Sequence, residues 1–232
     1  MTGKADARMT RARVLLDFDG TVTVTDTVDA ILERFAARSW IDVEEEWKSG
    51  AIGSRECLAR QTALIGATPK EIDTLVDTIE IDPGFDELLA TCERHGIAVT
   101  IVSDGYRRSI ERVLARSGHD LPSRSGVLEY RGRRRWKLVS PSARSACTSD
   151  SNTCKCKVAE ESKLPTILIG DGRSDFCVAG KVDLVLAKGS PKGPLARHCA
   201  GNGIKFEPVA GLAEAAKRIA AFIAKPDTRR AA

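Results

Sequence analysis

The sequence predicts an α/β protein in which helices flank a parallel β-sheet and one helical segment is inserted. Short runs of aliphatic and β-branched residues without polar alternation recur along the chain, as in strands that are covered on both faces. Stretches with apolar residues at helical spacing lie between these runs. Strands that alternate with helices form parallel sheets, so the two observations together indicate this fold class.

The predicted strands are residues 13–18, 97–102, 166–169, 184–186 and 204–206. The predicted helices are residues 28–35, 69–79, 86–95, 107–117 and 212–223. The best-marked helix start is Thr68, where Pro69 and Glu71 follow at the spacing of a capping box with proline at the first helical position. Gly96 and Gly118 mark two helix ends.

One part of the chain breaks the alternation of strands and helices. Residues 26–82 contain helical patterns and no candidate strand. We therefore expect two domains, an α/β core formed by residues 1–25 and 83–232 and a helical cap formed by residues 26–82. Residues 140–153 are rich in Ser, Thr and Asp and are predicted to be a mobile loop, and residues 1–13 a loose basic tail.

Composition and charge limit the classes of protein. The chain has 232 residues, of which 42% are hydrophobic and 29% charged, and a net charge of +4, which excludes global disorder. No apolar run reaches the ~18 residues of a membrane helix, and the basic N-terminus lacks the apolar stretch of a secretory signal. The seven cysteines have no disulfide-scaffold spacing, so free thiols and a cytoplasmic protein are expected.

Polar residues gather where three of the predicted strands end. Asp17 and Asp19 follow the first strand, Ser103 and Asp104 the second, and Asp171 the third. In an open parallel sheet these strand ends form the ligand-binding edge. Several carboxylates need a cation to share a small site, and oxygen ligands favour Mg²⁺. A helix N-terminus after Ser103 suits an anion, so the edge predicts a phosphoryl-transfer site.

The spacing of Asp17 and Asp19 suits two complementary roles, because residues two apart on a strand point to the same side. One carboxylate can attack phosphorus and form an aspartyl-phosphate. The other can protonate the leaving oxygen and then deprotonate the incoming water.

These segments resemble the four motifs of the haloacid dehalogenase superfamily. The run DFDGTVT from Asp17 resembles motif I, VSDG from Val102 motif II, Lys157 motif III and GDGRSD from Gly170 motif IV, in the order of the family. The resemblance implies a Rossmann-like, three-layer core with a small helical cap of the C1 type inserted between motifs I and II. It also implies a phosphatase, because dehalogenase members lack the second aspartate, here Asp19.

The resemblance implies Asp17 as nucleophile, Asp19 as general acid and base, and Lys157 as a phosphate-binding member of the catalytic set. Contacts to the substrate or its phosphate are expected from Thr21, Ser103, Asp104, Gly105 and Arg55. The implied Mg²⁺ ligands are Asp17, the backbone carbonyl of Asp19, Asp171 and Asp175.

Several of these assignments have alternatives. Lys155 competes with Lys157, which is preferred for its spacing to motif IV. Arg55 is equally well explained as a solvated helix residue, and Asp104 as a cap of the following helix. Trp47 is expected to pack inside the cap. The basic run RGRRRWK at residues 131–137 is predicted to be the exposed turn of a β-hairpin rather than a nucleic-acid patch.

The expected substrate is a small phosphorylated metabolite, with no membrane or nucleic-acid partner. The helical insertion resembles the cap of the phosphoserine-phosphatase-like branch, subfamily IB. Asp26 stands where phosphoserine phosphatases carry a glutamate for the substrate amine. Asp26, the Cys-x-Cys-Lys run from Cys154 and the GDGRSD form of motif IV are more similar to the 2-hydroxy-3-keto-5-methylthiopentenyl-1-phosphate phosphatases. The alternatives are a phosphoserine, phosphocholine or phosphoethanolamine phosphatase, a phosphomutase, a nucleic-acid 3′-phosphatase, or a non-catalytic protein that binds a phosphorylated ligand.

Overall fold

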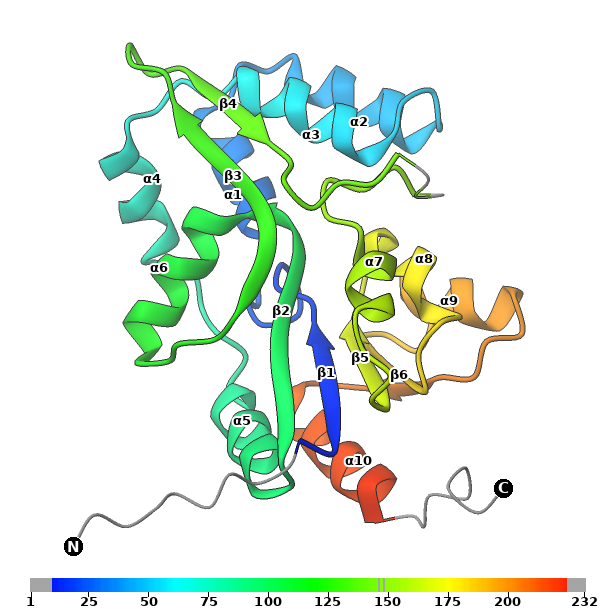
Figure 1. The fold of residues 1–232 in the computed structure, drawn as a ribbon. Helices are drawn as coiled ribbons and strands as arrows, with labels where there is room; N and C mark the ends of the chain where they lie inside the picture. The colour runs from blue at the N-terminus through cyan, green and yellow to red at the C-terminus, as the bar shows by residue number, and fades with distance from the viewer. Residues whose placement is uncertain (1–9, 146, 148, 225–232) are drawn as a thin grey trace, which may run out of the picture.

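The computed structural model describes residues 10–145, 147 and 149–224, so most of the predicted N-terminal tail lies outside the described residues (Figure 1). The strands are β1 (Ala12–Leu16), β2 (Ile97–Tyr106), β3 (Ser123–Tyr130), β4 (Trp136–Val139), β5 (Thr166–Gly170), β6 (Leu184–Lys188) and β7 (Glu207–Val209). The helices are α1 (Thr27–Phe35), α2 (Trp40–Lys48), α3 (Ser54–Ala63), α4 (Pro69–Val76), α5 (Phe85–Arg94), α6 (Arg107–Ser117), α7 (Lys155–Glu160), the 3₁₀ helix η1 (Arg173–Asp175), α8 (Phe176–Ala179), α9 (Pro194–Gly201) and α10 (Leu212–Ala224).

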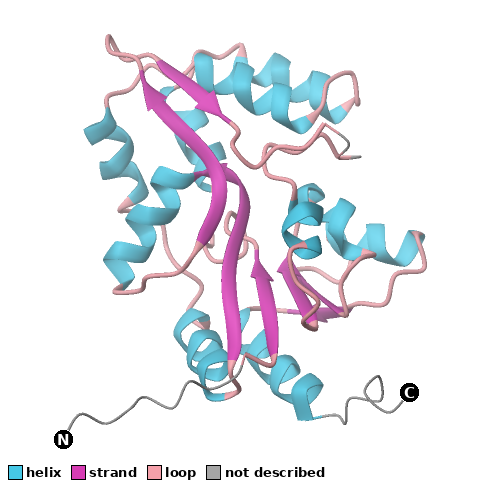
Figure 2. Cartoon of the chain, in the orientation of Figure 1, coloured by secondary structure: helices cyan, strands magenta, loops and turns pink. Residues whose placement is uncertain are grey.

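In the described part of the chain the strands form one sheet in the order β4-β3-β2-β1-β5-β6-β7 (Figure 2). Every neighbouring pair is parallel except β3 and β4, which form the predicted hairpin. The predicted mostly parallel α/β fold is therefore confirmed. The last strand was predicted three residues early, because Ile204 and Phe206 pack against a buried cluster while Glu207 takes the pairing position opposite Leu186.

The central strand β1 separates two hydrophobic layers, and all five of its residues are buried. Val14 and Leu16 pack into a cluster that includes residues of α1, α5, α6 and α10, whereas Leu15 packs with residues of α7, α8 and α9. Alternate residues of a strand point to opposite faces, so one apolar run serves both layers. Figure 1 shows α5 and α10 side by side under the amino ends of the central strands.

Four helices, α1 to α4, occupy the stretch in which no strand was predicted. The chain leaves and re-enters the core side by side, since Thr23 and Ile81 form an isolated antiparallel bridge. The predicted capping box opens α4: Thr68 Oγ1 accepts from Glu71 N at 3.3 Å, and Thr68 N donates to Glu71 Oε2 at 2.8 Å. The division into two domains at residues 26 and 82 stays a prediction.

The segment predicted to be a mobile loop is packed at its end. Ser151, Asn152 and Thr153 are buried, and Asn152 Nδ2 donates to Asp104 O at 2.8 Å. Polar residues at the end of this segment therefore form hydrogen bonds inside the protein. Composition alone does not distinguish such residues from polar residues that face solvent.

The structure also bears on membranes: within the described residues, none of the helices combines the length and apolar character that crossing a bilayer demands.

Candidate active site

Two aspartates follow the central strand and line a pocket at the carboxyl edge of the sheet. β1 ends at Leu16, and Asp17 and Asp19 lie in the loop that leaves it. Gly20 in this loop has a φ of 72°, and a Cβ there would lie 2.8 Å from Asp171 Oδ2. Glycine is therefore needed for this turn, which packs closely against the loop after β5.

Three carboxylates form a group that suits a hard cation. Asp17, Asp171 and Asp175 each contribute an oxygen, and these oxygens lie within 4.8 Å of one another. Thr21 Oγ1 orients this group by donating to Asp171 Oδ1 at 3.1 Å. A set of oxygen ligands without Cys or His is what Mg²⁺ prefers. Among the described residues the carboxylate of Asp19 lies outside the group, which leaves its expected metal contact to its backbone carbonyl.

A buried lysine neutralises this group, and it is Lys155 rather than the predicted Lys157. Lys155 Nζ lies 2.8 Å from Asp17 Oδ1 and 2.6 Å from Asp175 Oδ1, and the side chain is 0% exposed. Burial by itself would lower the pKa of Lys155, but the charges of Asp17 and Asp175 outweigh burial and raise it. Lys157 is exposed on the same helix α7. Residues two apart on a helix point about 200° from each other, so only one of the two lysines can face the site.

The carboxylate of Asp19 accepts hydrogen bonds from two other elements. Its Oδ1 accepts from Thr27 N at 2.9 Å and from Thr27 Oγ1 at 2.6 Å, and its Oδ2 accepts from Ser103 Oγ at 3.2 Å. Burial raises the pKa of Asp19 to about 6, against the lowering effect of the Thr27 hydrogen bonds. A Cβ at Gly105 would lie 2.2 Å from Asp19 Oδ2, so this predicted residue contributes by its lack of a side chain.

Three predicted substrate contacts have a different position or partner. Thr21 is fully buried beside Asp171 and is not among the described residues that line the pocket. Arg55 pairs with Asp150 at 2.8 Å and is also outside that lining, because its place on α3 turns it toward the loop before α7. Asp104 does line the pocket, but its Oδ1 accepts a backbone hydrogen bond at 2.8 Å from the same loop. Burial raises the pKa of Asp104 to about 6.

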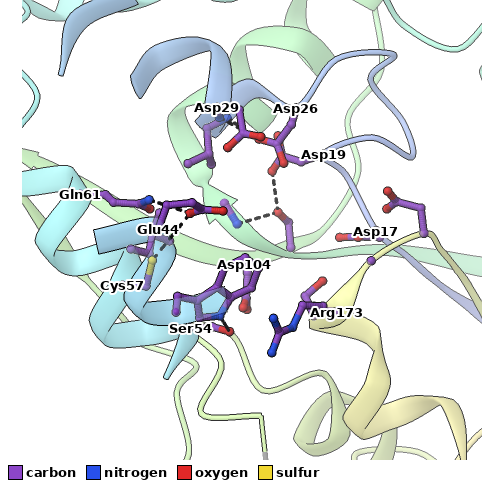
Figure 3. A pocket seen from close by; sticks show the side chains of 18 of the residues that line it. Asp17, Asp19, Asp26, Asp29, Glu44, Ser54, Cys57, Gln61, Asp104 and Arg173 are labelled. Atoms are coloured by element: carbon purple, nitrogen blue, oxygen red, sulfur yellow. Dashed lines mark hydrogen bonds between the residues drawn. The ribbon is translucent and has the colours of Figure 1, made fainter. Parts of the chain in front are cut away.

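The pocket is a cavity of about 340 Å³ between the sheet edge and the helices α1, α2 and α3 (Figure 3). Its helical wall carries Asp26, Asp29 and Glu44. Asp26 caps α1 and accepts from Val28 N at 2.8 Å and Asp29 N at 3.0 Å. Burial raises the pKa of Asp26 and, together with the charge of Glu44, that of Asp29. The helical wall is therefore acidic, like the edge of the sheet.

Several residues that line the pocket were not predicted from the sequence, and Trp47 and Arg173 matter most among them because they contact each other. Trp47 lines the pocket instead of only packing among the helices, and the Arg173 guanidinium carbon lies 4.5 Å from the centre of its ring. Arg173 stands inside the run GDGRSD, so its place between two predicted metal ligands was a usable signal. No comparable signal marked Trp47, because its direction depends on how α2 packs in the folded chain.

Comparisons with known proteins agree with this geometry. The family described as haloacid dehalogenase-like hydrolase matches residues 14–180. A 2-hydroxy-3-keto-5-methylthiopentenyl-1-phosphate phosphatase of Exiguobacterium sp. is 29% identical over 203 residues, which are 84% of this chain and 91% of the relative. A polyol phosphate phosphatase of Saccharomyces cerevisiae is 26% identical over 217 residues, 85% of this chain and 88% of the relative.

A solved structure of a phospho-aspartyl intermediate analogue of phosphoserine phosphatase has the same fold. It is similar with a TM-score of 0.68 at 17% identity, covering 90% of this chain and 99% of that chain. The family match spans well over half of the sequence and includes Asp17, Lys155 and Asp171. The chain therefore belongs to the haloacid dehalogenase-like hydrolase family, and within that family it is a phosphatase.

Proposed function

We propose that this phosphatase hydrolyses a small phosphomonoester through an aspartyl-phosphate on Asp17, with Mg²⁺ as cofactor. The observation that carries the proposal is the arrangement around Asp17. Its carboxylate borders the pocket, contacts Lys155 Nζ at 2.8 Å, and has an oxygen within 4.8 Å of oxygens of Asp171 and Asp175. A nucleophile that is adjacent to a cation and to a cation-binding group suits attack on a phosphate dianion.

The residues fit Mg²⁺ by the chemistry of their donors. Three carboxylates within 4.8 Å of one another carry more negative charge than the single buried Lys155 neutralises. Asp17, the carbonyl of Asp19, Asp171 and Asp175 would hold the ion. Bound there, Mg²⁺ would neutralise negative charge on the phosphate and on the surrounding carboxylates.

The residues of the chain then divide the reaction into two steps. Asp17 attacks phosphorus, the ester P–O bond breaks, and Asp19 donates its proton to the departing oxygen. In the second step Asp19 removes a proton from the water that attacks the aspartyl-phosphate, which releases inorganic phosphate and restores Asp17. The hydrogen bonds from Thr27 and Ser103 hold the Asp19 carboxyl in one orientation throughout both steps.

For the substrate, we propose the methionine-salvage enol phosphate, 2-hydroxy-3-keto-5-methylthiopentenyl-1-phosphate. Similarity to the Exiguobacterium phosphatase over most of both chains supports this choice. The pocket offers Val28, Cys57 and Leu58 as apolar contacts for a methylthio tail. The acidic helical wall disfavours the carboxylate of phosphoserine, because like charges repel in a partly desolvated site.

A phosphate-release screen tests both levels of the proposal. The wild-type protein should hydrolyse p-nitrophenyl phosphate with Mg²⁺, lose the activity in EDTA and recover it when Mg²⁺ is restored. Asp17→Asn should release no phosphate while melting as a folded protein. Full activity of that variant would contradict the aspartyl-phosphate mechanism. Among the enol phosphate, phosphoserine and phosphocholine, the enol phosphate should have the highest kcat/KM, and a preference for either of the others would overturn the substrate choice alone.

A further inference from the structure

Arg173 has an unusual position among the charged groups of the pocket. It begins the 3₁₀ helix η1, between Asp171 and Asp175. Among the described residues that line the pocket it is the one basic side chain. The other charged lining residues are carboxylates: Asp17, Asp19, Asp26, Asp29, Glu44, Asp104 and Asp171. Lys155, by contrast, is fully buried and occupied by two carboxylates.

The guanidinium of Arg173 stacks on an aromatic ring instead of pairing with these carboxylates. Its central carbon lies 4.5 Å from the centre of the Trp47 ring. The ring is fixed in turn, since Trp47 Nε1 donates to Ser54 Oγ at 2.9 Å, which ties α2 to the start of α3. Within the described residues the Arg173 side chain forms neither a hydrogen bond nor an ion pair, so its N–H donors remain available to a ligand.

Stacking of this kind orients a donor group without using its donors. A guanidinium over an indole ring is attracted by the ring face, while its N–H bonds point outward in the plane of the group. Figure 3 shows Arg173 directed into the pocket from the sheet side, opposite Glu44 and Asp29. The ligand group that suits these donors is an acceptor oxygen, and the surrounding carboxylates favour an uncharged one.

We propose that Arg173 determines specificity by donating hydrogen bonds to a carbonyl oxygen in the organic part of the substrate, with Trp47 as its positioning residue. This inference rests on the proposed phosphatase function and names the substrate class more closely: phosphomonoesters with an uncharged, carbonyl-bearing organic part. A site whose donors are arranged for an oxygen discriminates against an analogue that lacks the oxygen, because the donors are then left unpaired.

The test compares two phosphomonoesters that differ at one carbon. Hydroxyacetone phosphate carries a carbonyl where propyl phosphate carries a methylene group. Each is measured as a competitor of p-nitrophenyl phosphate hydrolysis in the presence of Mg²⁺, so that a Ki is obtained whether or not it is hydrolysed. For the wild-type enzyme, the Ki of hydroxyacetone phosphate should be at least about tenfold lower than the Ki of propyl phosphate. Arg173→Gln should bring the two Ki values within about threefold of each other.

Three further variants separate positioning from charge. Trp47→Ala should reduce the Ki ratio in the same direction as Arg173→Gln, and Trp47→Phe should restore most of the ratio. Arg197→Gln removes the same charge from an exposed residue of α9 outside the pocket lining and should leave the ratio unchanged.

The outcomes distinguish this inference from the function on which it rests. A wild-type protein that hydrolyses p-nitrophenyl phosphate but binds both competitors equally contradicts the role of Arg173 alone. The same holds if Arg173→Gln keeps the wild-type ratio, or if Trp47→Ala leaves the ratio intact. A protein that hydrolyses no phosphomonoester contradicts the proposed function, and the inference falls with it.

Discussion

The pocket has two acidic walls: the sheet wall, which carries Asp17, Asp19, Asp104 and Asp171, and the helical wall, which carries Asp26, Asp29 and Glu44. The carboxylates of the two walls have different kinds of partner. On the sheet side, Asp17 and Asp175 share contacts with the buried Lys155 Nζ. On the helical side, Glu44 Oε2 accepts a hydrogen bond from the neutral Gln61 Nε2 at 2.9 Å, and Glu44 Oε1 lies 3.9 Å from Nζ of the exposed Lys48. The sheet wall is therefore held together by a buried charge, and the helical wall by neutral donors.

The difference indicates that the sheet wall carries out the reaction and that the helical wall selects the substrate. Buried charges with paired partners keep a fixed geometry, which a reaction at phosphorus requires. A carboxylate with a neutral hydrogen-bond donor, such as Glu44 with Gln61, has no buried counter-charge, so in its ionised form it repels anionic groups on the rest of the substrate. Substitutions on the sheet wall should consequently change kcat, and substitutions on the helical wall should change which substrates bind.

The largest effect is expected at the buried lysine. Lys155→Met leaves Asp17 and Asp175 without their shared cation and should lower kcat by about 10²–10³-fold. Lys157→Met is the matched control on the same helix, and because Lys157 is exposed it should keep activity within about twofold of wild type. Steady-state kinetics with p-nitrophenyl phosphate measure both. A larger loss of kcat in Lys157→Met than in Lys155→Met would instead support Lys157 as the lysine of the site, as the motif spacing predicted.

The second prediction concerns the close packing of the sheet wall. A Cβ at Gly105 would lie 2.2 Å from Asp19 Oδ2, whereas a Cβ at Gly172 would meet nothing within 4 Å. Gly105→Ala should therefore displace the acid–base carboxyl and lower kcat by about tenfold or more, consistent with the cost of overpacking. Gly172→Ala should change kcat by less than about threefold. Equal losses in both variants would mean that loop flexibility, and not the space beside Asp19, limits the reaction.

The same two walls show how much of the site the sequence could predict. Asp17, Asp19 and Asp171 were predicted because each follows a hydrophobic strand, and Ser103 because it follows the apolar run of residues 97–102, although β2 extends past it to Tyr106. Parallel strands bring their carboxyl ends together. The choice between two lysines failed because it depends on where α7 begins and which face it buries.

For a related reason, the sequence did not predict which residues of the helical wall line the pocket. The stretch was correctly predicted to be helical, but α2 and α3 were not predicted individually, Trp47 was expected only to pack inside the cap, and nothing in the sequence marked Glu44. Their direction is set by contacts between segments far apart in the chain, such as the stack of Trp47 on Arg173. Local periodicity gives the face of a helix that is buried, but not the partner that buries it.

The third prediction tests the selective role of the helical wall. Glu44→Gln keeps the shape and the contact distance to Gln61 but removes one negative charge from the pocket. The Ki of phosphoserine as a competitor should fall by about twofold to fivefold, because repulsion of its carboxylate weakens. The kcat for p-nitrophenyl phosphate should stay within about twofold of wild type. A fall in kcat with no change in Ki would place Glu44 in the chemistry instead.

The smallest effect is expected in α4, which takes no part in either wall. Thr68 completes the capping box at the start of this helix, and Thr68→Ala should lower the free energy of unfolding by about 1 kcal/mol without changing kcat. Thr74→Ala is the matched control inside the same helix. Its hydroxyl only bonds back to the Lys70 carbonyl, which the helix already uses, so its removal should be neutral or slightly stabilising. Urea unfolding of both variants measures the difference. A change in the ratio of substrate Ki values in Thr68→Ala would contradict this expectation. It would mean that α4, which does not line the pocket, sets the position of the helices that do, and that residues outside the two walls also determine which substrates bind.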